Sequence, residues 1–342
     1  MLLPLSAVYA LSVTIRNWLF DRNILRETRV DVPVVCVGNI SAGGVGKTPL
    51  VEFLARHFRA EKKRVAILSR GYGRHGSGYL VVSNGAQRCA EIELAGDEPS
   101  ELANALDGVV VAVDENRVRG AKNLIAQFHP DVIILDDGFQ HRSLRRDFNI
   151  VVMTAGEILE GEQLLPAGNR REPLSGLRRA HCVVITKSRD DAELQKARLQ
   201  LAERFKGGLY GAATTLQSLR LASTNEVCEL GKLAGSKALL FSGIGQPEHF
   251  EETLAPLRLR RMGHLKFPDH HWFAQADLAA IEAAYRDEGA DAIITTRKDV
   301  QRLTSEPAQR FLEDLPVYVA SVRLQLSERR EIFFNELEST LW

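Results

Sequence analysis

The sequence predicts an α/β fold that contains a mostly parallel sheet and a second, smaller α/β domain. Short apolar, β-branched runs alternate with helix-length segments, as in "VPVVCVGN", "RVAILSRG" and "DVIILDDG". Continuously apolar strands separated by helices are typical of a parallel sheet that is covered on both faces. After about residue 207 the pattern changes to a long extended segment, which is followed by a shorter α/β set.

This pattern divides the 342 residues into three parts. Residues 1–207 are predicted to form the larger, parallel-sheet domain. Residues 208–326 are predicted to form the smaller domain and the linker, in which two long extended segments pair as a ribbon. Residues 327–342 are predicted to form a helix that returns to the first domain.

The composition argues against a disordered chain and against a polytopic membrane protein. Hydrophobic residues make up 45% of the chain and charged residues 26%, which are ordinary values for a globular protein. Lys+Arg and Asp+Glu both number 44, so no overall charge indicates a nucleic-acid partner. The four scattered cysteines are expected to be free thiols in a reducing cytoplasm.

The first segment, "MLLPLSAVYALSV", is apolar for about a dozen residues, which is fewer than the roughly 20 needed to span a bilayer. No positive charge precedes the apolar run, as a secretory signal would require. Two interpretations stay open: a helix packed on the protein's own core, or a helix lying in a membrane interface. Trp18 and Phe20 beside Arg16 and Arg22 favour the interface.

A glycine-rich loop stands between an apolar strand and an amphipathic helix in "VGNISAGGVGKTPLVEFLARHF", residues 37–58. Strand, loop and helix in this order are the context that the P-loop motif GxxxxGK[ST] requires. The loop's backbone amides and the helix dipole bind phosphate, Lys47 is expected to reach the β- and γ-phosphates, and Thr48 to offer its hydroxyl to Mg²⁺. The predicted nucleotide-binding residues are Ser41, Ala42, Gly43, Gly44, Val45, Gly46, Lys47 and Thr48. Residues 1–207 are therefore predicted to be a P-loop nucleotide-binding domain.

Two adjacent acidic residues, Asp136 and Asp137, end the apolar strand "DVIILDDG". Ligands of open α/β sheets bind at the carboxyl ends of the strands, and a P-loop fold needs carboxylates there to hold Mg²⁺. Both residues are therefore candidate metal ligands, and the sequence leaves open which one contacts the metal directly.

The nucleotide is predicted to be ATP rather than GTP. The segment "VVITKSRDD" is close to the N/T-K-x-D motif that reads guanine, but the aspartate position holds Arg189 and Asp190 comes one residue late.

Further polar segments have both a structural and a functional interpretation. Asp97 and Glu98 in "AGDEPSELA" stand where acids commonly cap a helix. "LLPAGNRREPLSGLRRA" places four arginines around Glu172, and "KFPDHHWF" places His270 next to Asp269.

Taken together, these segments resemble one family. "VGNISAGGVGKTP", "LSRGYGR", "GDEP", "DDGFQH", "LLPAGNRREP", "GIGQPEHF" and "FPDH" occur in the order typical of tetraacyldisaccharide 4′-kinase, from about residue 4 to about residue 300. Ser41 matches this family's own variant of the P-loop. Arg297 departs from the family, which often has an acid there.

The resemblance implies a kinase that transfers the γ-phosphoryl group of ATP to the 4′-hydroxyl of tetraacyldisaccharide 1-phosphate in lipid A biosynthesis, at the cytoplasmic face of the bacterial inner membrane. It implies that Asp97 accepts the hydroxyl proton and that His270 pairs with Asp97. Glu172 would join Thr48 and the aspartates around Mg²⁺, and Arg171 would stabilise the γ-phosphate.

Two further expectations concern partners. A lipid acceptor and the membrane surface match the first helix and a set of arginines at positions 142, 145, 146, 170, 171, 178 and 179, unless those arginines form ion pairs within the protein. The alternative function is a P-loop NTPase that acts as a partner-binding switch.

Overall fold

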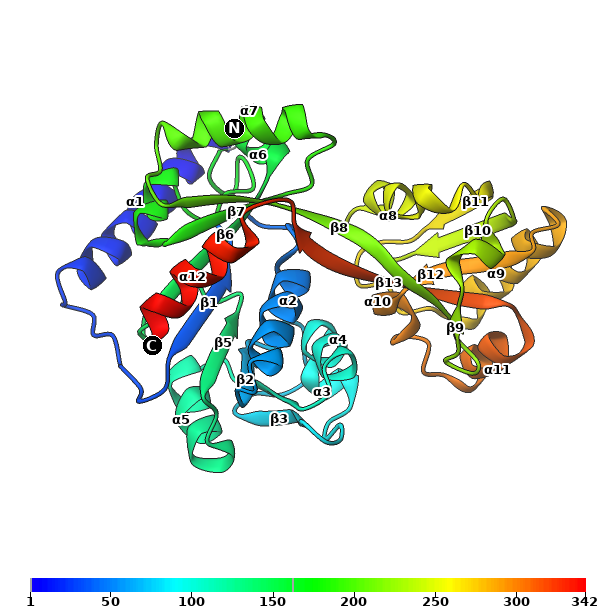
Figure 1. The fold of residues 1–342 in the computed structure, drawn as a ribbon, viewed down its shortest axis with the longest axis horizontal. Coiled ribbons are helices and arrows are strands. Elements are labelled where there is room, and N and C mark those ends of the chain that lie inside the picture. The colour runs from blue at the N-terminus through cyan, green and yellow to red at the C-terminus, as the bar shows by residue number, and fades with distance from the viewer. Residues whose placement is uncertain (1, 162) are drawn as a thin grey trace. The chain divides into compact units, whose positions relative to one another are not determined.

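The computed structural model describes residues 2–161 and 163–342. The described chain forms two compact units (Figure 1). Unit 1 contains the residues up to Ala213 together with Leu324–Trp342, and unit 2 contains Thr214–Arg323. The boundaries lie within two long strands, a few residues from the positions 207 and 326 that the sequence suggested.

Unit 1 has a central, mostly parallel sheet, which confirms the predicted α/β class. Its order is β3-β4-β2-β5-β1-β6-β7-β8, and only β3 runs antiparallel to its neighbour. The strands are β1 (Val34–Gly38), β2 (Val65–Ser69), β3 (Leu80–Asn84), β4 (Val109–Val113), β5 (Val132–Asp136), β6 (Phe148–Thr154), β7 (Cys182–Thr186) and the first part of β8 (Gly208–Leu221).

Helices cover both faces of this sheet because every strand carries apolar side chains on both sides. One core cluster packs α2 (Lys47–Ala60), α4 (Asp97–Ala105) and α12 (Arg330–Leu341) against one face. A second cluster packs α5 (Arg117–Phe128), α6 (Ala155–Glu160) and α7 (Asp191–Ala202) against the other. Unit 1 also contains α1 (Leu3–Asp21), the short α3 (Ile92–Ala95) and the 3₁₀ helix η1 (Leu174–Arg179).

The strand register positions the site of unit 1. β1 lies between β5 and β6, and Val37 is opposite Asp136 on one side and Ile150 on the other. The loop that follows β1 therefore begins beside the carboxyl end of β5, where the acidic pair stands.

Unit 2 has a smaller parallel sheet in the order β11-β10-β12-β13. Its strands are β10 (Lys237–Ser242), β11 (Arg260–Lys266), β12 (Ala292–Thr296) and β13 (Val317–Leu326), and the short β9 (Val227–Cys228) pairs with β8. α9 (Gln275–Asp287) and α11 (Glu306–Asp314) pack on one face, α8 (Pro247–Leu254) packs on the other, and α10 (Arg297–Val300) follows β12. Two 3₁₀ turns, η2 (Leu230–Leu233) and η3 (Ala255–Leu257), complete the unit.

Two strands connect the units. β8 leaves unit 1 from its pairing with β7, and β13 is the neighbour of β8 in the strand order. β13 leads back into unit 1, where Phe333, Phe334 and Leu337 of α12 are buried in the first core cluster.

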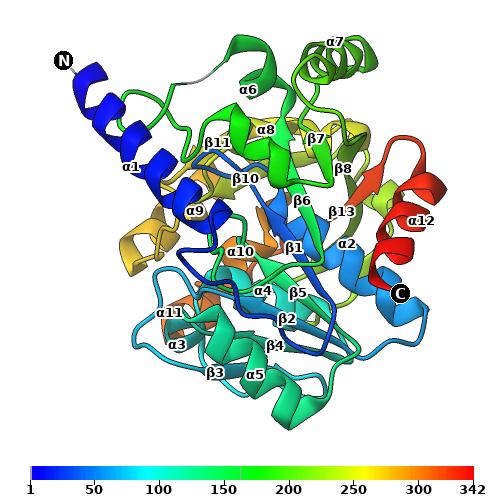
Figure 2. The same ribbon diagram turned by 90° about the vertical axis from the view of Figure 1, so that its left-hand side faces the viewer.

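Helix α1 has two polar residues among the three that it buries and exposes most of its large apolar residues. The buried residues are Ser6, Val13 and Asn17, and the side chains of Ser6 and Asn17 bond to Leu164 and Glu172 of the segment before β7. Figure 2 shows α1 along the outside of unit 1. Large apolar residues on the exposed side repeat at helical spacing at Leu5, Val8, Leu11, Ile15 and Trp18, each 48–67% exposed. Within the described residues, no helix has the length and apolar character needed to cross a bilayer.

Candidate active site

The glycine loop turns between β1 and α2 with two residues in the left-handed region, Gly43 (φ 111°) and Gly46 (φ 91°). Side chains there would be strained, so glycine allows the loop to fold back over the start of α2. Hydrogen bonds to other segments of unit 1 hold the loop in place. Thr186 donates its hydroxyl to the carbonyl of Val45 at 2.7 Å, and the amide of Ala42 donates to the carbonyl of Asn169 at 2.7 Å. The predicted loop, residues 41–48, thus forms a single structural feature.

The segment "TKS" after β7 supports this loop. Lys187 donates its ammonium group to the carbonyl of Gly44, and the Thr186 hydroxyl bonds to Val45. The similarity of this segment to a guanine-reading motif therefore has a structural explanation.

Lys47 begins α2, and its Nζ lies 3.5 Å from Oδ1 of Asp137. Thr48 follows in the first helical turn and is half-buried. The basic group, the hydroxyl and the loop amides all stand at the amino end of α2, where the helix dipole favours anions.

The acidic pair consists of two chemically different carboxylates. Asp136 is fully buried, and its Oδ2 accepts a hydrogen bond from Ser69 at 3.1 Å. Burial, followed by the charges of Glu98 and Asp137, raises the pKa of Asp136 to about 7. Burial also acts to raise the pKa of Asp137, but Lys47 and Arg171 outweigh it and lower that pKa.

Asp136 fits a divalent cation. Its Oδ1 is buried and accepts no hydrogen bond from any described residue. A buried carboxylate oxygen without a donor is costly, and a bound cation would offset that cost. Among the described residues, no group of three or more His, Cys, Asp or Glu side chains forms a protein-only metal cluster. Mg²⁺ does not need one, because it is commonly held by one or two protein oxygens together with substrate phosphates.

Arg171 is held between the glycine loop and α1. Its amide donates to the carbonyl of Ile40 at 2.7 Å, its own carbonyl accepts from the Tyr9 hydroxyl at 3.0 Å, and its guanidinium bonds Asp137 at 3.0 Å. Arg171 and Lys47 thus contact the same carboxylate.

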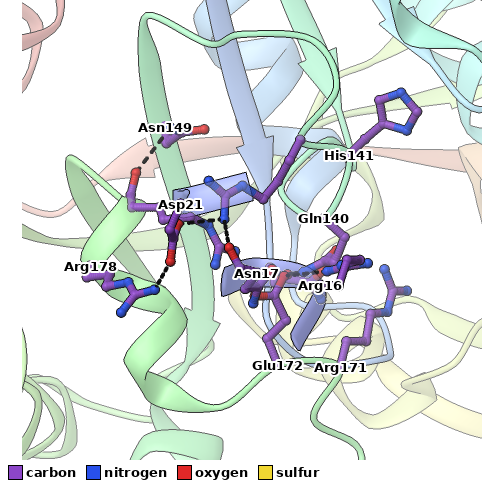
Figure 3. A network of polar contacts seen from close by, with 12 residues as sticks. Arg16, Asn17, Asp21, Gln140, His141, Asn149, Arg171, Glu172 and Arg178 are labelled. Carbon is purple, nitrogen blue, oxygen red and sulfur yellow. Dashed lines mark hydrogen bonds and ion pairs between the residues drawn. The ribbon is translucent and has the colours of Figure 1, made fainter. Parts of the chain in front are cut away.

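Glu172, the next residue, is completely buried in a network that ties down α1 (Figure 3). Its Oε2 accepts hydrogen bonds from Arg179 at 2.7 Å and Asn17 at 3.0 Å, and its Oε1 lies 3.7 Å from the guanidinium of Arg16. The structure therefore pairs Glu172 with cations rather than grouping it with Asp136. These contacts support an anchoring role for a residue that we expected to contact Mg²⁺.

Other arginines of the same region also bind within the protein. Arg142 pairs with Asp21 and Glu27, Arg178 pairs with Asp21, and buried Arg170 donates to the carbonyl of Glu157. These three residues and Arg179 therefore have partners within the protein, which is the alternative that the sequence left open, and the Arg178 side chain is nevertheless 62% exposed.

Asp97 opens α4 and is half-buried. The preceding Gly96 has φ 90°, and a Cβ atom there would lie 3.0 Å from the carbonyl of Tyr72 in the loop after β2. Because β2 pairs with β5, the start of α4 stands at the same edge of the sheet as the acidic pair. The effect of Glu98 on the pKa of Asp136 agrees with this placement.

His270 lies in unit 2, after β11, and its backbone adopts φ 63°. Its neighbour His271 is occupied locally, because its Nε2 lies 2.9 Å from Oδ2 of Asp277 and its ring stacks on Phe267. His270 also has partners within unit 2, Arg302 and Lys298, and it remains the candidate for chemistry because it is the histidine of the "FPDH" motif.

Comparisons with known proteins agree with this geometry. The family model described as tetraacyldisaccharide-1-P 4′-kinase matches residues 1–341. The chain belongs to this family. A tetraacyldisaccharide 4′-kinase from Chlorobaculum tepidum is 38% identical over 311 residues, which cover 90% of this chain and 87% of the relative. One from Parabacteroides distasonis is 35% identical, with 98% and 93% covered. A crystal structure of LpxK from Aquifex aeolicus in complex with ATP matches with a TM-score of 0.78 at 33% identity, covering 100% of this chain and 98% of that one.

This member of the tetraacyldisaccharide-1-P 4′-kinase family also has site residues that sequence reasoning missed. Ser69 bonds Asp136. Arg117, only 2% exposed, donates to the carbonyl of Asp114 at 2.9 Å; burial lowers the pKa of Arg117, and the charges of Asp136 and Asp137 act against that shift. Burial, followed by Arg117 and Arg146, lowers the pKa of His141 to about 4. The positions of these residues in the sequence could have identified them, because Ser69 ends β2 and Arg117 begins α5, the helix that follows β4.

Proposed function

We propose that this chain transfers the γ-phosphoryl group of ATP to the 4′-hydroxyl of tetraacyldisaccharide 1-phosphate, with Asp97 as the general base. As a member of its family, the chain is an ATP-dependent kinase of lipid A biosynthesis. The observation that carries the mechanism is the arrangement of Lys47, Arg171 and Asp137 at the amino end of α2.

Binding of ATP follows from the glycine loop. Backbone amides of residues 41–48 would surround the phosphates, and Lys47 would contact the β- and γ-phosphates. Arg171 would neutralise charge that develops on the γ-phosphoryl group during transfer. Its hydrogen bond to Asp137 supports this role, because the same guanidinium already stands beside Lys47's carboxylate partner.

Thr48 and Asp136 would hold Mg²⁺, with Asp137 adjacent. When bound, the metal ion would draw negative charge from the phosphate oxygens. We place Glu172 outside this metal site, because the contacts with Arg179 and Asn17 support its anchoring of α1.

The chemical step needs a proton acceptor. The 4′-oxygen of the sugar attacks the γ-phosphorus, the bond from that phosphorus to the β,γ-bridging oxygen breaks, and ADP leaves. The hydroxyl proton passes to the carboxylate of Asp97. A positioned carboxylate suffices because proton removal is late in a loose transition state. His270 would pair with Asp97 and orient it.

Helix α1 is proposed to lie in the interface of the inner membrane on its cytoplasmic side. Its exposed apolar stripe supports this, since polar side chains fix the opposite face of the helix to unit 1. Exposed Arg22, Arg26 and Arg29 follow the helix and would contact anionic head groups. The acyl chains of the acceptor would then remain in the bilayer during phosphorylation.

Incubation with γ-labelled ATP and tetraacyldisaccharide 1-phosphate tests the proposal. We expect label in the lipid, at the 4′-position, and little free phosphate. Label that appears only as free phosphate would contradict the kinase and favour the alternative of a partner-binding NTPase switch.

A further inference from the structure

The environment of His270 is built by three segments that follow neighbouring parallel strands of unit 2. Gly243 follows β10, residues 267–271 follow β11, and α10 follows β12. Carboxyl ends of parallel strands lie at one edge of a sheet, so the three segments meet there. The amide of Gly243 donates to Asp299 of α10 at 3.0 Å, which links the first segment to the third.

The backbone of His270 is fixed in a conformation that non-glycine residues seldom adopt. Its φ is 63°, in the left-handed region. Its amide donates to the carbonyl of Gly243 at 3.2 Å and to Oδ1 of Asp269 at 3.0 Å. These contacts determine the direction in which the imidazole leaves the chain.

The side chain of Arg302 also contacts the backbone of Gly243. Its side chain is fully buried, and Nη1 donates to the carbonyl of Gly243 at 3.1 Å and lies 3.5 Å from Oδ1 of Asp299. Asp299, also fully buried, accepts a second hydrogen bond from the Thr296 hydroxyl at 2.6 Å. The guanidinium therefore has a fixed position.

The remaining terminal nitrogen of Arg302, Nη2, lies 3.3 Å from Nδ1 of His270. A guanidinium can only donate hydrogen bonds, and a neutral imidazole has one nitrogen that donates and one that accepts. In a neutral imidazole this contact favours Nδ1 as the acceptor and the ring proton on Nε2.

Lys298 favours the opposite tautomer, with the ring proton on Nδ1, but its contact with the imidazole is weaker. Its Nζ lies 3.5 Å from Nε2 of His270, and an ammonium also only donates. This distance is longer, the Lys298 side chain is 19% exposed, and its ammonium also bonds Oδ1 of Asp269 at 3.2 Å. The other oxygen of Asp269 lies 3.8 Å from Nε2 and favours a proton there.

We propose that Arg302 is a positioning residue that fixes His270 as the Nε2–H tautomer. This inference rests on the proposed role of His270. A histidine that orients a carboxylate must present a proton to it, and the Nε2–H tautomer does so at the nitrogen farther from Arg302.

Nitrogen-15 NMR of the full-length protein with labelled histidine tests the assignment directly. The chain has nine histidines, and His270→Gln identifies the two ring signals of His270 by their loss. We expect a protonated signal for Nε2 and an unprotonated one for Nδ1. Arg302→Met should transfer population to the Nδ1–H form, and Arg302→Lys, which keeps a donor, should retain the original form. Arg310→Met changes an exposed arginine of the same unit and should leave both signals unchanged.

Kinetics give the second readout. Arg302→Met should lower kcat by about tenfold to a hundredfold, as is usual when a group that orients a histidine is removed, while KM for ATP stays unchanged. Arg302→Lys should restore most of the loss. In the His270→Gln background, Arg302→Met should have no further effect on kcat, because both changes remove the same interaction between Arg302 and His270.

Different results would overturn the role of Arg302 and the catalytic role of His270. An Nδ1–H tautomer in the unaltered protein would overturn the role of Arg302 whatever the activities, and that spectrum decides the question even if Arg302→Met does not fold. Full activity of His270→Gln would instead overturn the catalytic role of His270 while the tautomer assignment stands.

Discussion

The ammonium group of Lys47 lies 3.5 Å from the carboxylate of Asp137, the second acid after β5. Because the same carboxylate bonds Arg171, one negative charge positions the two cations that we expect to contact the γ-phosphate. Asp137 thus organises the phosphate site as well as standing beside the proposed metal ligand.

Replacing Asp137 should separate binding from turnover. In Asp137→Asn the two cations are no longer neutralised, so ATP should bind at least as tightly. Both cations lose their fixed position, so kcat should fall by about a hundredfold or more. Fluorescent-nucleotide titration and the labelled-ATP assay measure the two quantities. Unchanged turnover in this variant would remove Asp137 from the mechanism.

Asp136 should make stability depend on pH. Its folded-state pKa is raised to about 7, so the folded protein binds more protons than the unfolded chain between the ordinary carboxylate pKa and about 7. The contribution of this group to stability therefore falls as the pH rises through that window. Asp136→Asn should raise Tm at pH 8 and have little effect near pH 4. Equal shifts at both pH values would contradict the burial of the charge.

The same carboxylate should control the metal. Mg²⁺ binds the ionised form, so its protection against thermal unfolding should increase from pH 6 to pH 8 and disappear in Asp136→Asn. Calorimetric scans with and without Mg²⁺ provide the measurement, and pH-independent protection would place the metal elsewhere.

Removal of the proposed base should leave nucleotide binding intact. Asp97→Ala should lose about a hundredfold or more in kcat, the usual scale for a general base. Its Kd for ATP should not change. Glu91→Ala, an exposed acid just before α3, is the matched control and should behave as the parent. Normal turnover of Asp97→Ala would exclude it as the base.

Glu172→Gln should affect the attachment of α1 and leave metal dependence unchanged. Loss of this charge leaves the largely buried Arg179 without its carboxylate partner, which should destabilise unit 1 by about 3 kcal/mol. Limited proteolysis should then cut near residues 1–25 more readily. Exposed Glu203→Gln serves as the control. If the Mg²⁺ requirement rises while stability is kept, Glu172 is a metal ligand after all.

The exposed stripe of α1 should carry membrane binding. Leu11→Gln with Ile15→Gln should weaken association with vesicles of phosphatidylethanolamine and phosphatidylglycerol by at least about tenfold. Thr14→Gln alters an exposed polar position of the same helix and should not. Undiminished co-sedimentation of the double variant would mean that other surfaces anchor the protein.

The strands, the glycine loop and the acidic pair could be predicted because each depends on local sequence. An apolar run fixes a buried strand, and a glycine loop before GKT fixes a phosphate site. The contacts of Arg178 with Asp21 and of Glu172 with Asn17 could not be predicted, because they join α1 to a segment about 155 residues away in the chain. The apolar residues of α1 similarly did not reveal which face is exposed, since that depends on where Ser6 and Asn17 find partners.

Arg302 illustrates the same limit in unit 2. "TTRKDVQRL" reads as an ordinary strand followed by a charged turn, and nothing local connects its last arginine to a histidine 32 positions earlier. Arg302 and His270 come together because the segments that follow β10, β11 and β12 meet at one edge of the sheet of unit 2.

The return of α12 to unit 1 has a consequence for biosynthesis. Phe333, Phe334 and Leu337 close one face of the sheet that carries the glycine loop, yet they follow the whole of unit 2 in the chain. Unit 2 lies wholly upstream of them and can fold earlier. A nascent chain that stops before Phe333 would leave that apolar face uncovered, so ATP binding should emerge only after α12 has been synthesised and has packed on unit 1.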